Sequence, residues 1–201
     1  MVGKLSGMVE IAWIGIALSH LCHLLSVLLL YGMTERVFGR EHHRLAFLSA
    51  ALHITCPAGA FLSAPYGEAP FSFLNFAGFY LYASALWDDA RSSPSRRDLK
   101  FLSAGAFFGL ATTVRSNGLV SGIPFAYDAV TSVAGITRNG ISPSTLRRLF
   151  FLCLGGGFIA AGMVGPQYVA YVEYCQAADV PRRWCYSLLP SIYTWVQSYY
   201  W

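Results

Sequence analysis

Five long apolar stretches constrain this chain more than any other feature. They cover residues 10–33, 45–64, 70–87, 101–113 and 149–165. Each is apolar enough to cross or enter a hydrocarbon core about 30 Å thick. Hydrophobic residues make up 55% of the 201 positions and charged residues only 12%, which is outside the range of soluble domains. The sequence therefore predicts an all-α, polytopic transmembrane protein in which residues 1–201 form one helical membrane domain.

The basic residues are concentrated in three connectors, residues 34–44, 88–100 and 137–148. Together these connectors hold ten of the 14 lysines and arginines. The positive-inside rule places them in the cytoplasm, so the net charge of +4 is not a nucleic-acid signal. The expected helices are approximately 10–33, 45–64, 70–87, 101–116, 121–136 and 149–173, followed by a lumenal aromatic segment over 174–201.

Residues 101–136 admit two interpretations. This region is about 35 residues long and is interrupted by Arg115, Asn117, Gly118, Gly122 and Pro124. In the first interpretation, two limbs meet in a turn near residues 116–122 on the far side of the membrane. In the alternative, a single span is followed by a long loop on that side.

Arg115 is the most unusual residue of this region. An arginine within a membrane span costs about 2.5 to 3.5 kcal/mol and normally has a partner. The nearest acids in the expected topology are Glu68 and Glu173. Arg115 either fixes helix packing by pairing with a glutamate, or binds an anion such as phosphate together with Asn117 and the backbone of Gly118.

Other polar and aromatic residues are expected on the same far face. Tyr66 and Glu68 lie in a proline-bounded turn, either as a solvated loop or as groups that orient a sugar hydroxyl. The segment 174–201 contains Trp184, Tyr193 and Trp201 among its aromatic residues. These rings indicate either an interfacial aromatic belt or a surface that stacks on carbohydrate.

The positions of the cysteines and histidines indicate which disulfide and metal chemistry the chain allows. Cys175 and Cys185 are the two cysteines expected outside the cytoplasm and the hydrocarbon core, so a disulfide between them is plausible in an oxidising lumen. His20 and His23 share a helix but lack a third ligand, so no metal site is predicted. The adjacent Asp88 and Asp89 lie in a cytoplasmic connector and indicate a solvated helix end.

Several ordered motifs together resemble one family. They are HLLSVLLLYGMTERVFG, the pattern P-x-x-x-F-L-x-x-x-Y-x-E-x-x-F over residues 57–71, TTVRSNGLVSG, PQYVAYVEYC and RRWCYSLLPSIYTWVQSYYW. The chain resembles the GPI mannosyltransferase 2 (PIG-V) family, with a fungal character. Gly67 departs from the family pattern, where serine is common, and Pro70 stands where leucine is usual.

The resemblance implies a multi-pass enzyme of the endoplasmic-reticulum membrane with a GT-C-type fold. It would transfer the second mannose, in α-1,6 linkage, from dolichol-phosphate-mannose to the GPI precursor. The expected ligands are membrane lipid, this lipid-linked donor and the glycolipid acceptor, with no cofactor, no metal and no nucleic acid. A small membrane subunit of the endoplasmic reticulum is a further expected partner.

The resemblance also gives the candidate residues their roles. Arg115 and Asn117 would bind the donor phosphate, while Tyr66, Trp184, Tyr193 and Trp201 would contact substrate. Glu68 is the candidate catalytic carboxylate within this chain, although the usual base of the family lies in an N-terminal lumenal loop.

Relative to the family, the chain is expected to be a fragment that lacks this N-terminal loop and the C-terminal spans. A non-catalytic membrane scaffold derived from the family is therefore the alternative function. A small transporter is less well supported, because the sequence has no internal repeat.

The predicted orientation can be tested with glycosylation acceptors. An acceptor inserted near Gly67 is expected to be modified in microsomes, because that turn faces the lumen. An acceptor near Ser93 is expected to remain unmodified. Modification at Ser93 but not at Gly67 would reverse the orientation.

Overall fold

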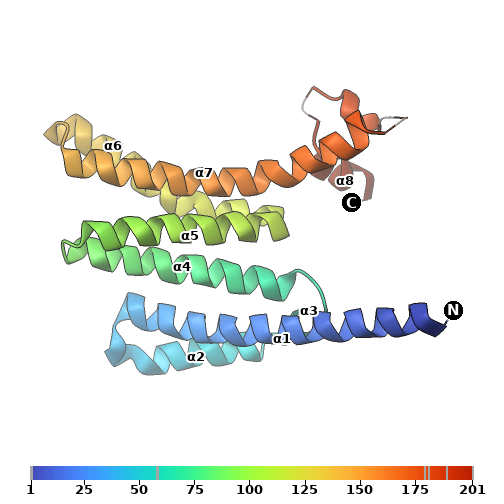
Figure 1. Ribbon diagram of the computed structural model, residues 1–201. Helices are drawn as coiled ribbons and strands as arrows, with labels where there is room; N and C mark the ends of the chain where they lie inside the picture. Colours follow the sequence, from blue (N-terminus) through green and yellow to red (C-terminus); the bar gives the residue numbers. More distant parts are fainter. Residues whose placement is uncertain (1, 58, 179, 181, 189, 201) are drawn as a thin grey trace.

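The computed structural model describes residues 2–57, 59–178, 180, 182–188 and 190–200, and these residues form no strand. Figure 1 shows long helices lying roughly side by side. The protein is an all-α, multi-pass membrane protein. Its α-helices are α1 (Val2–Phe38), α2 (His43–Ile54), α3 (Gly59–Ser63), α4 (Glu68–Ala90), α5 (Pro94–Val114), α6 (Ile123–Asn139), α7 (Pro143–Tyr171) and α8 (Ile192–Tyr200).

Four short helical segments complete the chain. Three are 3-10 helices, η1 (Arg40–His42), η2 (Ser116–Gly122) and η4 (Arg183–Tyr186), and η3 (Val172–Gln176) is a π-helix that continues α7. Helix α1 packs on both α2 and α4, α5 lies between α4 and α7, and α6 packs on α7.

The three basic connectors meet at one end of the bundle, which we call the arginine-rich end. The indole Nε1 of Trp87 donates a hydrogen bond to the carbonyl of Arg36 at 2.6 Å, which joins the first connector to the end of α4. Arg147 of α7 contacts Asp98 of α5 at 2.5 Å. Helices α3 and α8 and both chain termini lie at the opposite end (Figure 1).

The predicted helix over residues 45–64 is wrong as a single element. Helix α2 ends at Ile54, and α3 begins only at Gly59. Pro57 explains the break, because proline lacks an N–H donor and disfavours a helical residue before it. With 12 residues, α2 is about 18 Å long, so it does not cross a hydrocarbon core by itself.

The other helix boundaries differ from the predicted ones for local reasons. Helix α1 extends past residue 33 and ends before Gly39, whose φ of 95° a glycine adopts without strain. Helices α5 and α7 begin earlier than expected, at Pro94 and Pro143, since proline suits the first helical position. Ser142 caps α7 by accepting a hydrogen bond from the Thr145 amide at 3.2 Å.

Residues 101–136 form two antiparallel limbs. Helix α5 ends at Val114, Arg115 is extended, and η2 and α6 return toward the arginine-rich end. The turn is tight because η2 folds onto α5: a Cβ added to Gly118 would lie 2.8 Å from the Thr112 backbone. Only glycine fits this close approach.

Glycines also set the distance between α5 and α7. A Cβ on Gly105 would lie 2.5 Å from the Cα of Gly155, and one on Gly162 would lie 2.2 Å from the carbonyl oxygen of Gly109. Gly105 and Gly109 have the four-residue spacing that lets membrane helices touch through their backbones. Aromatic rings fill the space beside this contact, including the fully buried Phe101 and Phe108.

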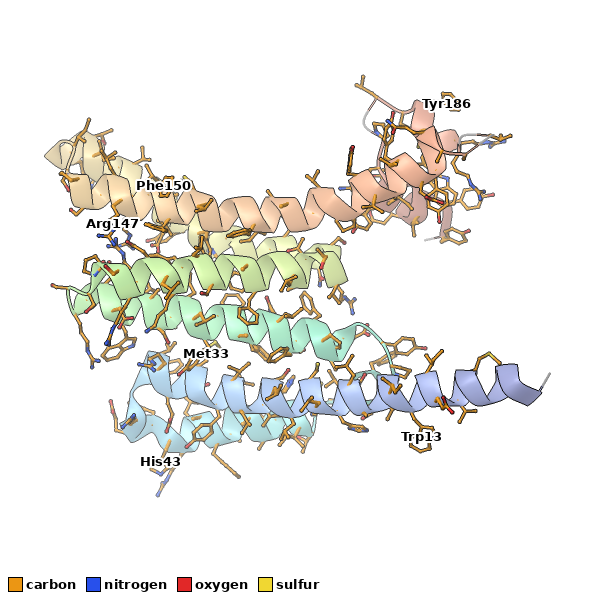
Figure 2. All side chains as sticks on the ribbon, in the orientation of Figure 1. Trp13, Met33, His43, Arg147, Phe150 and Tyr186 are labelled. Atoms are coloured by element: carbon orange, nitrogen blue, oxygen red, sulfur yellow. A yellow bond between two sulfur atoms is a disulfide. The ribbon has the colours of Figure 1, made fainter. Side chains whose placement is uncertain are left out.

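Three segments of the described chain are long and apolar enough to cross a membrane. They are Gly7–Phe38, Ser116–Arg138 and Pro143–Gln176. Helices α4 and α5, with 23 and 21 residues, pack among them and bury several small residues. Many large apolar side chains point outward (Figure 2), as expected for a surface that contacts lipid.

The glycine contact predicts a position-specific effect on stability. Gly105→Ala is expected to destabilise the protein by about 1 to 3 kcal/mol, because the methyl group meets backbone that has no room to move. Gly157→Ala is the matched control, since nothing lies within 4 Å of an added Cβ there. Thermal unfolding in detergent measures both variants, and equal melting temperatures would contradict the proposed packing role.

Candidate functional site

Arg115 lies where α5 ends and the chain reverses. Its backbone is extended, with φ of −144° and ψ of 127°, and the Gly118 amide donates a hydrogen bond to its carbonyl at 2.9 Å. The Arg115 guanidinium forms an ion pair with Glu68, in the first turn of α4. The site therefore joins two segments that are 47 residues apart in sequence.

The ion pair leaves most of the guanidinium available. Its Nη1 contacts Glu68, and its other nitrogens have no hydrogen-bond partner among the described residues. The side chains of Arg115 and Glu68 are 42% and 33% exposed, so the pair contributes little to stability, about 0.2 to 1 kcal/mol. The ion pair therefore holds the Arg115 guanidinium at the end of α5, where its remaining N–H groups can donate hydrogen bonds to an anion.

Two further predicted residues lie near this ion pair in sequence. Asn117 follows Arg115 by two positions, and Tyr66 precedes Glu68 by two positions. Asn117 is exposed in η2, and the described structure gives its amide no side-chain hydrogen bond. Tyr66 is 59% exposed, and its ring centroid lies 6.2 Å from that of Phe61. Both side chains are therefore accessible at the end of the bundle that carries Arg115.

Glu173 was the second acid expected near Arg115. It lies in the π-helical turn that follows α7 and is exposed. No ion pair joins Glu173 to Arg115 in the part of the chain that the structure describes. Among the described residues, Glu68 is therefore the ion-pair partner of Arg115.

The aromatic segment is held by α7 and not by Arg115. A disulfide joins Cys175 to Cys185 with their Cα atoms 5.6 Å apart. Ser191 donates a hydrogen bond to Gln167 of α7 at 2.5 Å. Helix α8 and the end of α5 lie at the same end of the bundle (Figure 1), and a common surface formed by these rings and Arg115 stays a prediction.

The individual rings of this segment differ in exposure. Trp184 is only 4% exposed, so it packs as a core residue and has little surface for sugar stacking. Tyr193 is half-buried on α8. Trp201 lies outside the described residues.

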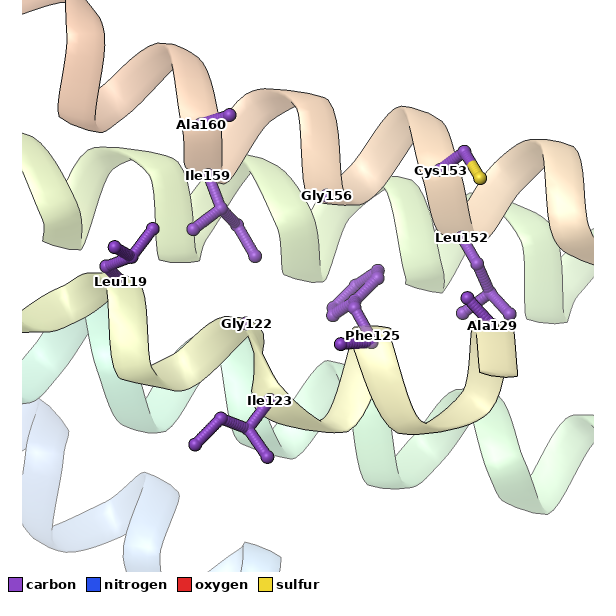
Figure 3. Close-up of a pocket in the computed structure, with 11 residues that line it drawn as sticks. Leu119, Gly122, Ile123, Phe125, Ala129, Leu152, Cys153, Gly156, Ile159 and Ala160 are labelled. Atoms are coloured by element: carbon purple, nitrogen blue, oxygen red, sulfur yellow. The ribbon is translucent and has the colours of Figure 1, made fainter. Parts of the chain in front are cut away.

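An apolar groove runs beside the reversal, between α7 and the limb formed by η2 and α6 (Figure 3). It begins at Leu119, four residues after Arg115, and has a volume of about 410 Å³. Several of its lining residues are small, and a Cβ at Gly156 would meet nothing within 4 Å. The full lining comprises Leu119, Gly122, Ile123, Phe125, Ala126, Ala129, Leu152, Cys153, Gly156, Ile159 and Ala160.

Sequence reasoning missed a buried ion-pair network at the arginine-rich end. Asp98 is 3% exposed and accepts hydrogen bonds from Arg97 at 2.8 Å and from Arg147 at 2.5 Å. Arg97 also contacts Asp89 at 2.7 Å. The interpretation of Asp89 as a solvated helix end is therefore wrong, since its side chain is half-buried and its carboxylate pairs with Arg97.

The same network reaches α6 through Arg148. This arginine pairs with Asp89 and lies 3.3 Å from Asp128. The Tyr82 hydroxyl donates to Asp128 at 2.5 Å. Asp88, also expected to be solvated, is half-buried and pairs with Lys100 at 2.5 Å. The acidic residues lie on three different helices, α4, α5 and α6, so they form no local sequence pattern from which this network was predictable.

Metal chemistry has no evident centre in the described residues. No group of three or more histidine, cysteine or acidic side chains is arranged to hold an ion there. His23 instead packs against His53, with ring centroids 5.1 Å apart. The aspartates at the arginine-rich end are neutralised by arginine and lysine.

These features define a class: a multi-pass helical membrane protein with an accessible arginine at one end, an apolar groove beside it, and paired charges at the other end. The chain belongs to the mannosyltransferase (PIG-V) family, whose sequence model matches residues 1–201. No solved structure matches the chain.

Proteins named GPI mannosyltransferase 2 are among its relatives. That of Aspergillus oryzae is 49% identical over 189 residues, which are 92% of this chain and 44% of the relative. That of Yarrowia lipolytica is 35% identical and is covered over 46% of its length. The GPI alpha-1,6-mannosyltransferase 2 of Cricetulus griseus is 32% identical over 79% of this chain and 34% of its own length. The chain thus spans less than half the length of these curated relatives.

Proposed function

We propose that the protein containing this chain is a mannosyltransferase of GPI-anchor biosynthesis. It transfers a mannose in α-1,6 linkage from dolichol-phosphate-mannose to the GPI precursor, on the lumenal side of the endoplasmic-reticulum membrane. The names of the relatives support this activity. The observation in the structure that carries the proposal is Arg115, held by Glu68 at the end opposite the basic connectors.

The chemistry of the transfer explains why such an arginine is needed. An acceptor hydroxyl attacks the anomeric carbon of mannose, and the bond to the dolichyl phosphate breaks. Negative charge then accumulates on the departing phosphate, where a preorganised cation stabilises the transition state more than the ground state. Arg115 supplies this cation, and the exposed amide of Asn117 supplies a further donor.

The groove supports a lipid-linked donor. A polyisoprenyl chain is apolar, and the groove lined by Leu119 and Ile159 is apolar along its length. Since Leu119 follows Arg115 by one short turn, a phosphate bound at Arg115 would place its lipid chain near the start of the groove. Burial of the chain against these side chains would add affinity without polar contacts.

The remaining roles are assigned by the same proposal. Glu68 orients the guanidinium and is our candidate to bind the acceptor hydroxyl, while the principal base comes from a lumenal loop outside this chain. Tyr66 and Tyr193 contact the sugar substrates. The reaction needs neither metal nor cofactor beyond the donor, and a small membrane subunit assembles with the enzyme.

Substitution of Arg115 tests the phosphate-binding role. In a chimera, this chain replaces the matching part of the Aspergillus oryzae relative, and mannose transfer is measured in microsomes that lack the endogenous activity. Arg115→Gln is expected to lower transfer about 100-fold or more, the usual effect of removing a donor that stabilises transition-state charge. Arg183→Gln is the control, because Arg183 is an exposed cation at the same end.

Protein amount and thermal stability are measured alongside, and both are expected to stay near those of the parent, because the Glu68 pair is weak. Normal transfer by Arg115→Gln would refute the role of Arg115. An inactive parent chimera would refute the proposed function of the chain.

Filling the groove tests the path of the lipid chain. Gly156→Leu projects a side chain into the groove and is expected to raise the KM for dolichol-phosphate-mannose about tenfold, since it displaces roughly two buried methylene groups. Gly157→Leu is the matched control, because Gly157 is equally open but does not line the groove. Identical KM values for the two variants would place the lipid chain elsewhere.

A further inference from the structure

A second, polar pocket lies at the arginine-rich end between α1 and α4. Its volume is about 490 Å³. The C-terminal turns of α1 form one wall, and the last turns of α4 form the other. Its lining includes Glu35, Arg36, Arg40, Tyr80, Trp87 and Arg91. The pocket is at the opposite end of the bundle from Arg115, so it is separate from the proposed transfer site (Figure 1).

The walls of this pocket are fixed by specific contacts. Trp87 donates its indole hydrogen to the Arg36 carbonyl at 2.6 Å. Arg36 donates to the Tyr80 hydroxyl at 3.3 Å, and its guanidinium lies 5.7 Å from the centre of that ring. The Arg91 guanidinium lies 5.1 Å from the Trp87 ring. Two of the three arginines are therefore positioned by aromatic rings before any ligand binds.

The pocket has an excess of positive charge. Its lining carries Arg36, Arg40 and Arg91 against the single carboxylate of Glu35. In the described structure none of these arginines forms an ion pair, whereas Arg97, Arg147 and Arg148 at the same end are all paired with aspartates. The arginines of the buried network are thus neutralised by aspartates, whereas the three arginines of the pocket share one carboxylate and form an ion pair with no described residue.

We propose that this pocket binds the phosphate-bearing headgroup of an anionic phospholipid in the cytoplasmic leaflet. Because the three basic connectors are expected in the cytoplasm, the arginine-rich end lies at the level of the lipid headgroups of the cytoplasmic leaflet. Basic pockets between membrane helices on this side suit such headgroups, because guanidinium groups donate several hydrogen bonds to one phosphate.

Apolar neighbours favour a lipid over a soluble phosphate. Val37 and Phe38, which follow the lining residue Arg36 in sequence, are each more than half exposed, and Leu86, which precedes Trp87, is also exposed. These side chains would contact acyl chains while the arginines hold the headgroup. This assignment is independent of the proposed transferase activity.

Lipid binding to the whole chain in detergent tests the proposal. Native mass spectrometry compares the retention of phosphatidylserine and phosphatidylcholine added at equal concentrations. The chain is expected to retain phosphatidylserine preferentially. Arg36→Gln/Arg40→Gln/Arg91→Gln is expected to weaken this retention at least tenfold, since each cation near a headgroup contributes severalfold.

The matched control is Arg44→Gln/Arg96→Gln/Arg138→Gln. It removes the same charge from the same end, but its three arginines are exposed and do not line the pocket. The control is expected to retain phosphatidylserine as the parent does. Equal loss in both triple variants would overturn the proposal, because general electrostatic attraction would then explain the binding.

Two further measurements cover folding and the source of the phosphate. Arg36 contacts Tyr80, so Arg40→Gln/Arg91→Gln is made as a second variant that keeps Arg36 and is expected to lose preference for phosphatidylserine while keeping the parent circular-dichroism spectrum. A folded double variant with parent-like retention would overturn the proposal. In a separate arm, inorganic phosphate is expected not to displace the lipid at millimolar concentration, and full displacement would assign the pocket to a soluble anion instead.

Discussion

The close contact between α5 and α7 is the constraint on which the rest of the structure depends. Gly105 and Gly109 meet Gly155 and the backbone of α7 with no room for a Cβ. Apolar helices in lipid are not driven together by the exclusion of water, so close backbone contact stabilises their association through van der Waals packing. It fixes the position of α7, and thereby both the wall of the apolar groove and the helix to which the aromatic segment is tethered.

Charged residues at the two ends of the bundle have different environments. At the arginine-rich end, Asp98 and Arg97 are buried and paired, so they clamp α4, α5 and α7 in one arrangement. At the opposite end, Arg115 and Glu68 are partly exposed and bound to each other through a single nitrogen. The first end is suited to holding helices, and the second is suited to exchanging a protein contact for a charged substrate.

The reversal at Arg115 links the polar site to the membrane interior. Because Gly118 lets η2 fold directly onto α5, the arginine and the first residue of the groove are only four positions apart. A lipid-linked sugar phosphate has the same order of parts, an anion joined to a long apolar chain. This order of parts is the structural feature on which the proposed substrate class rests.

The sequence by itself determined the membrane-helical class, the common end of the basic connectors and the family, because hydropathy, arginine position and motif order are local properties of the chain. It also identified Glu68 as a possible partner of Arg115. It predicted α2 poorly, since one proline at 57 divides a continuous apolar stretch. Only the tertiary structure decided that Asp98 is buried and Asp89 is paired with arginines, that Trp184 is a packing residue, and that α1 and α4 enclose a basic pocket. These properties depend on which helices pack against each other. That packing is determined by contacts between side chains that are far apart in sequence.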